Sequence, residues 1–112
     1  MKLPNGERAV VDIAKLRDYS LSATHEEGKH KARVFAAALG VGPGQAEWLR
    51  DRLIIAAREV DCQLGDFDEY GQRYVIDFDV EFGGNSTPLR SAWIVRSGEN
   101  FPRPIICYVL DR

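Results

Sequence analysis

The sequence predicts an α+β domain in which N-terminal helices pack on one face of a roughly four-stranded antiparallel sheet. Two observations indicate this fold class. Apolar residues recur at helical spacing in the first half of the chain, and from residue 74 onward they alternate with polar residues at a period of two. Because helices and strands occupy separate parts of the chain, a segregated arrangement is favoured over an alternating one. The length of 112 residues fits a single domain, 1–112.

The first expected helix is short and begins after Asp12, whose carboxylate can accept hydrogen bonds from the free amides of a helix start. Ile13, Leu16 and Tyr19 follow at helical spacing and give this helix an apolar face. Residues 3–7 before it read LPNGE and predict a turn, because Asn-Gly readily supplies positive φ.

Two longer helices are expected next. One carries an apolar stripe and ends at Gly40, a residue type suited to the left-handed conformation after a helix. Its stripe is formed by Ala32, Phe35, Ala36 and Leu39. The other is expected from about Gln45 to Val60, and its buried face comprises Ala46, Leu49, Leu53, Ala56 and Val60.

The second half of the chain predicts strands. Alternation of apolar and polar residues is typical of an antiparallel sheet that buries one face and leaves the other open. The expected strands are 74–82, 89–96 and 105–110, with a weak additional strand near 60–64 and connections at 83–88 and 97–104. The acidic segment DFDEY at 66–70 is expected to be a solvated turn.

Composition restricts the function classes. The formal net charge is -2, whereas nucleic-acid binders usually carry a basic excess, so contact with RNA would require a local basic patch. No apolar run approaches the roughly 20 residues of a membrane span, and the N-terminus has no apolar signal core. Cys62 and Cys107 stand far apart and in no metal spacing. We therefore expect a cytoplasmic protein with reduced cysteines, no cofactor, no metal and no membrane partner.

Both histidines lie at the expected start of the second helix. His25 and His30 are five residues apart, which is the wrong spacing for two metal ligands on one helix face. Thr24 and Glu27 predict a capping box, which makes His25 a half-buried residue that helps to fix the helix start. Lys31 is well placed to hold an anion beside the free amides of this helix start.

A second group of charged residues lies on one face of the expected sheet. Strand parity places Arg73, Asp77, Asp79, Glu81, Arg90 and Arg96 on the face opposite the apolar residues. Two interpretations are open: the charges form cross-strand ion pairs, or the arginines hold a phosphate or carboxylate.

An ordered set of motifs across nearly the whole chain resembles an uncharacterised bacterial domain family. The motifs are KLPNG at 2–6, HEEGKHKARVFAAALG at 25–40, EYGQR at 69–73, RSAWI at 90–94 and FPRPIICYVL at 101–110. Members of this family look like domains found alone or at the C-terminal end of polymorphic toxins. Their layout is similar to that of the barnase–EndoU–colicin–RelE group of nucleases, so the resemblance implies helices followed by a four-stranded antiparallel sheet.

The resemblance also implies a metal-independent ribonuclease. Cleavage of RNA by acid/base chemistry requires a base, an acid and cations that stabilise the pentavalent phosphate. The expected catalytic residues are His25, Lys31 and Arg90. The residues expected to bind substrate are His30, Arg73, Tyr70, Arg96 and Tyr108. The expected partners are RNA and an immunity protein or another product of a neighbouring gene.

A non-catalytic interaction module is the alternative, either an inactive relative of such toxins or one half of a toxin/immunity-type pair. The mildly acidic charge favours it, as does Glu26, which stands where the family often has proline after the histidine. Geometry separates the two hypotheses. An open cleft that unites His25, Lys31 and Arg90 favours the enzyme, and a flat surface with those residues held in salt bridges favours the module.

Overall fold

Four antiparallel strands form one sheet in the computed structural model, which describes residues 1–110. The strands follow one another in the order β1-β2-β3-β4, so each pairs with its neighbour in the sequence. Their bounds are β1 Gln63–Asp68, β2 Gly71–Phe82, β3 Asn85–Arg96 and β4 Pro102–Val109. The predicted α+β class is therefore confirmed.

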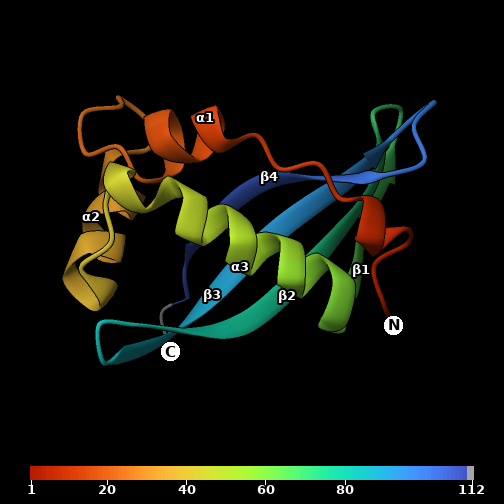
Figure 1. The fold of residues 1–112 in the computed structure, drawn as a ribbon. Helices are drawn as coiled ribbons and strands as arrows, with labels where there is room; N and C mark the ends of the chain where they lie inside the picture. The colour runs from red at the N-terminus through yellow and green to blue at the C-terminus, as the bar shows by residue number, and fades with distance from the viewer. Residues whose placement is uncertain (111–112) are drawn as a thin grey trace.

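Three α-helices precede the sheet and lie on one of its faces, with α3 running across it and α1 and α2 grouped toward one end (Figure 1). Their bounds are α1 Ile13–Lys15, α2 Lys29–Leu39 and α3 Ala46–Glu59. Asp12 caps α1 through a hydrogen bond from the amide of Ala14 at 2.9 Å, and α2 ends at Gly40 with φ of 72°. Both helix ends are formed by the residue types that the sequence predicts.

The core lies between the helices and the sheet. Alternate residues of β3, namely Leu89, Ser91 and Trp93, are buried and face the helices. Phe35 of α2 and Leu49 of α3 are also fully buried. Burying each large apolar side chain stabilises the fold by about 1.5–3 kcal/mol, so this layer is the main favourable term. The opposite face of the sheet is left open.

The hairpin between β2 and β3 is tighter than expected. Strand pairing continues to Phe82 opposite Asn85, so the connection is Gly83 and Gly84 alone, and the expected turn at 83–88 was too long. Both glycines have positive φ, 58° and 84°, as the two central residues of a type I′ turn require.

The two edge strands also differ from their expected bounds. β1 covers 63–68 rather than 60–64, because the Asp68 carboxylate accepts the amide hydrogen of Tyr70 and closes a short turn directly after it. β4 begins at Pro102, three residues before the expected start. Proline is tolerated there because an edge strand needs its amide hydrogens on one side only.

Among the described helices, none combines the length and the apolar character that crossing a membrane would take.

Cys62 and Cys107 are both buried and free, and burial raises the pKa of the Cys107 thiol to about 12. Cys107 is therefore a neutral core residue, as expected from its place in an apolar strand.

One polar side chain lies at the centre of the core. The Ser91 hydroxyl donates to the carbonyl oxygen of Ile76 at 3.0 Å and accepts the indole hydrogen of Trp93 Nε1 at 2.8 Å. Ser91 and Trp93 are both fully buried, so neither group has access to water. This short network ties β3 to β2 behind the open face of the sheet.

We expect Ser91→Ala to lower the free energy of unfolding by about 1–3 kcal/mol, because it leaves the indole hydrogen of Trp93 buried without an acceptor. Ser86→Ala, at an exposed position of the same strand, serves as the control and should change stability by less than about 0.5 kcal/mol. Urea denaturation measures both. Equal stability of the two variants would show that the network contributes nothing.

Candidate functional site

His25 closes the turn that leads directly into α2. Its Nδ1 atom accepts hydrogen bonds from the backbone amides of Glu27 and Gly28, both at 3.1 Å. The ring also packs against the ring of Tyr19, with centroids 4.4 Å apart. The expectation of a half-buried histidine that fixes the helix start is confirmed.

The expected capping box was wrong. The Thr24 hydroxyl lies 3.2 Å from the Ser22 hydroxyl, and the amide of Glu27 donates to the His25 ring instead. The imidazole of His25 thereby acts as a serine or aspartate side chain does at other helix starts, because it accepts the amides of the two residues directly before α2.

This cap also determines what the His25 ring can do chemically. A nitrogen that accepts two amide hydrogens carries no proton, so the proton of the neutral ring lies on Nε2. In this state Nε2 can donate a hydrogen bond to an anion, and Nδ1 is not available as a base.

A row of side chains crosses the open face of the sheet. Asp77 of β2, Arg90 of β3 and Tyr108 of β4 lie directly opposite one another in the strand register. Lys31 of α2 extends the row, since its Nζ lies 4.7 Å from the centroid of the Tyr108 ring. We call these four residues the Arg90 row.

Arg90 is held firmly within this row. Its Nε and an Nη atom donate to the two carboxylate oxygens of Asp77 at 2.8 and 2.9 Å. The hydrogen bonds and charge of Asp77, with a smaller contribution from the Tyr108 hydroxyl, raise the pKa of the Arg90 guanidinium above its usual value. The side chains are 39% and 36% exposed, so the pair remains accessible from solvent.

Other expected site residues lie outside the row. His30 is exposed on α2, and Tyr70 is exposed in the turn between β1 and β2. His25 contacts Tyr19 and the amides of Glu27 and Gly28, and these residues are not members of the Arg90 row. Of the three expected catalytic residues, the structure thus links Lys31 and Arg90, through Tyr108.

Arg73 and Arg96 gather further along the sheet, where they line a cleft of about 340 Å³. Arg103 of β4 and Lys15 of α1 line the same cleft, which we call the arginine cleft. The cleft lies at the end of β3 that is remote from Arg90. Its lining residue Ile94 is four residues further along the strand than Arg90, a distance of about 13 Å.

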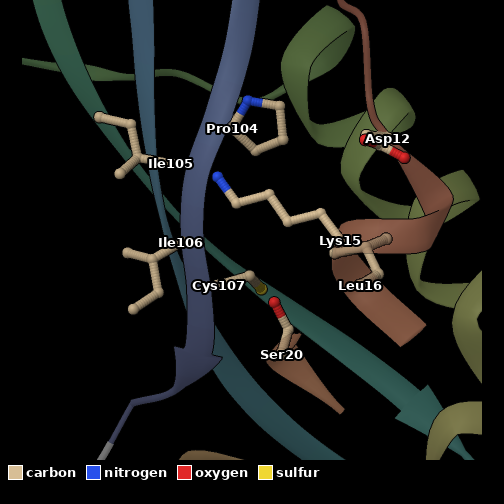
Figure 2. A pocket seen from close by; sticks show the side chains of 8 residues that line it. All are labelled: Asp12, Lys15, Leu16, Ser20, Pro104, Ile105, Ile106 and Cys107. Carbon is tan, nitrogen blue, oxygen red and sulfur yellow. The ribbon is translucent and has the colours of Figure 1, made fainter. Parts of the chain in front are cut away.

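Sequence reasoning missed Arg103 and Lys15. Arg103 stands in the segment that was expected to be a turn, and only its pairing opposite Ile94 brings it onto the open face. Lys15 belongs to a different layer, and Figure 2 shows its amino group pointing toward Pro104 on β4. The one feature of the sequence that could have indicated a role for Arg103 is its charge between two prolines.

Arg103 is fixed by two neighbours. It donates to both carboxylate oxygens of Glu99 at 3.0 and 3.1 Å, and its guanidinium lies 5.0 Å from the centroid of the Phe101 ring. The hydrogen bonds from Arg103 lower the pKa of the Glu99 carboxyl below its usual value. Arg73 is held in a similar way by Asp68, with an Nη–Oδ distance of 2.6 Å.

Comparison with known proteins gives two similarities. Residues 2–111 match a family described as Domain of unknown function (DUF6883), and no curated protein matches the chain. The fold is similar to a chain of a "Contact-dependent growth inhibition toxin - immunity protein complex from Klebsiella pneumoniae 342". That chain is 19% identical, with a TM-score of 0.69 over 96% of this chain and 97% of the other. At this identity the likeness shows a shared fold.

We expect His25→Ala to lower the free energy of unfolding by about 0.5–2 kcal/mol, as loss of a helix cap does. His25→Asn should retain most of the stability, because the asparagine oxygen can accept from the same amides. Thermal unfolding followed by circular dichroism measures both variants. Equal losses for alanine and asparagine would contradict the capping role.

The pair of Glu99 and Arg103 predicts a pH-dependent contribution to stability. The pKa of Glu99 is lowered in the folded state. The ion pair therefore contributes fully to the free energy of unfolding above the unfolded-state pKa of about 4.3, and this contribution is lost as pH falls through the folded-state pKa. The stability difference between wild type and Glu99→Gln should therefore be largest above about pH 5 and vanish in stronger acid. Urea titrations across this range check it, and a constant difference would contradict it.

Proposed function

This chain belongs to the DUF6883 family of domains of unknown function, and we propose that it is a toxin-like domain that cleaves RNA without a metal ion. The family membership expected from its motifs is confirmed. The proposal is supported by the fold shared with a chain of a toxin–immunity complex and by the cations on the open face of the sheet. An immunity protein is the partner that this role implies, and the cytoplasm is where RNA would be met.

The Arg90 row is the observation that carries the proposal. It presents two cations, Lys31 and Arg90, on either side of an aromatic ring on an accessible surface. Positioned cations stabilise the negative charge that develops on a pentavalent phosphate, and the ring of Tyr108 offers a surface on which a base can stack. Asp77 occupies two of the five N–H donors of Arg90 and the Tyr108 hydroxyl a third, which leaves two for phosphate oxygens.

The histidines take different roles in this proposal. With its proton on Nε2, His25 donates a hydrogen bond to a phosphate oxygen and acts as a neutral electrophile. Proton transfer is assigned to His30, because it is exposed on α2 next to Lys31 in the sequence and both of its ring nitrogens can exchange protons with substrate. The sequence alone favours His25 for this step.

A non-catalytic interaction module is the second candidate function, and one observation favours it. Arg90 is engaged by Asp77 through both carboxylate oxygens, which is the salt-bridged arrangement expected of such a module. In that case the Arg90 row would bind a partner protein, and the charged pair would set the specificity of that contact.

Incubation of the purified protein with total bacterial RNA in the presence of a chelator tests the enzyme proposal. We expect wild type to cleave RNA and the Lys31→Ala and His30→Ala variants to be slower by about 100-fold or more, as loss of a charge-stabilising or proton-transferring group predicts. Arg58→Ala, which removes an exposed arginine from the last turn of α3, is the matched control.

The control should cleave as fast as wild type. Absence of cleavage by the wild-type protein would leave the interaction module as the better function. Cleavage that survives both substitutions would place the reaction at another site and contradict the assigned roles.

A further inference from the structure

The arginine cleft reverses the charge of the chain locally. Four cationic side chains line it together with the carboxylate of Asp12. Asp68 and Glu99 pair with two of these cations, so four positive and three negative charges leave a local excess of +1, whereas the whole chain has a formal net charge of -2. The four are Lys15, Arg73, Arg96 and Arg103. Like charges concentrated in a concave site focus a positive potential, which favours an anionic ligand.

The strand register places three of these arginines around one residue. Arg73 of β2 and Arg103 of β4 both lie directly opposite Ile94 of β3, one on each side. Arg96 lies two residues further along β3 and on the same face, so it is the diagonal neighbour of both. Adjacent strands are about 4.8 Å apart, so the three long side chains can meet above Ile94.

Two of the three guanidinium groups are already oriented. Asp68 holds Arg73, while Glu99 and Phe101 hold Arg103. Each arginine has five N–H donors, and the hydrogen bonds to these carboxylates use one from Arg73 and two from Arg103. The donors that are left fit phosphate oxygens, which planar guanidinium groups bind in pairs.

The floor of the cleft is apolar. Ile94 is only 8% exposed, and Pro104 and Ile105 of β4 complete the floor. Ile105 is the extra residue where the pairing of β3 with β4 shifts register, and such bulges commonly re-aim a side chain next to a binding site. A cationic rim over an apolar floor suits a ligand with a phosphate group and a flat organic ring.

We propose that the arginine cleft is a phosphate-binding subsite that holds a nucleotide phosphate through Arg73, Arg96, Arg103 and Lys15, with the sugar or base over Ile94, Pro104 and Ile105. As a subsite for an RNA strand that is cut at the Arg90 row, it rests on the function proposed above. The same chemistry would also accept a free nucleotide, and the experiment separates the two sources.

Arg96 is the residue to substitute. No ion pair joins it to another described residue, so its removal leaves no carboxylate without a partner, unlike removal of Arg73 or Arg103. Arg58→Ala again removes one exposed arginine from the helix layer and controls for net charge. Arg96→Lys keeps the charge and removes the planar fork.

Binding is measured with a short 2′-O-methyl RNA, which cannot be cleaved because its attacking oxygen is blocked, and with adenosine monophosphate, both over a series of salt concentrations. We expect Arg96→Ala to weaken RNA binding about tenfold, as loss of a charge-assisted contact predicts. It should also lower the slope of log K against log salt by about 0.7, the value for one phosphate contact of a single strand. Arg96→Lys should keep the slope with weaker binding, and Arg58→Ala should match wild type.

If Arg96→Ala weakens the binding of RNA and adenosine monophosphate does not bind, the subsite belongs to an RNA strand. If Arg96→Ala weakens the binding of adenosine monophosphate to the same extent, the subsite belongs to a free nucleotide. Equal effects of Arg96→Ala and Arg58→Ala would overturn the proposal, as would the absence of binding by both probes. Because the RNA probe is not a substrate, Arg96-dependent binding by a protein that cleaves no RNA would refute the nuclease function and leave the subsite standing.

Discussion

The register between β2 and β3 is the constraint on which both the core and the candidate site depend. Pairing runs without a shift from Gly71 opposite Arg96 to Phe82 opposite Asn85. Side chains alternate between the two faces, so a slip of one residue would turn Trp93 toward solvent and Arg90 toward the helices. The two-residue turn at Gly83 and Gly84 fixes this register at one end, and the buried link between Ser91 and Ile76 fixes it near the middle.

Carboxylates on and beside the sheet hold the arginines of its open face in place. Asp77 holds Arg90, and in the arginine cleft Asp68 holds Arg73 and Glu99 holds Arg103. These pairs are partly exposed, so each adds little to stability. Their effect is to hold long side chains in defined orientations, and this lowers the entropy lost when a ligand is bound.

The fold and part of the site follow from local sequence patterns. Helical stripes, the alternation on β2 and β3, the Asp12 cap and the Gly40 terminus depend on residues close together in the chain. They agree with the structure except at Ala36, which was expected in the buried stripe of α2 and is exposed. The side-chain contacts at the start of α2 could not be predicted from local sequence, because the partner of the Glu27 amide depends on how the preceding loop packs. The His25 ring rests on Tyr19 and reaches this amide in place of the Thr24 hydroxyl.

The sequence by itself determined the α+β class, the two faces of the sheet and the family, because each depends on residue spacing or on the order of motifs along the chain. Only the tertiary structure decided which cations meet. Lys31 and Arg90 both neighbour Tyr108 of β4, and Arg73 and Arg103 lie on opposite sides of Ile94 and line one cleft. Such neighbours are separated by long stretches of chain, and their contact depends on strand order and helix packing rather than on any local preference.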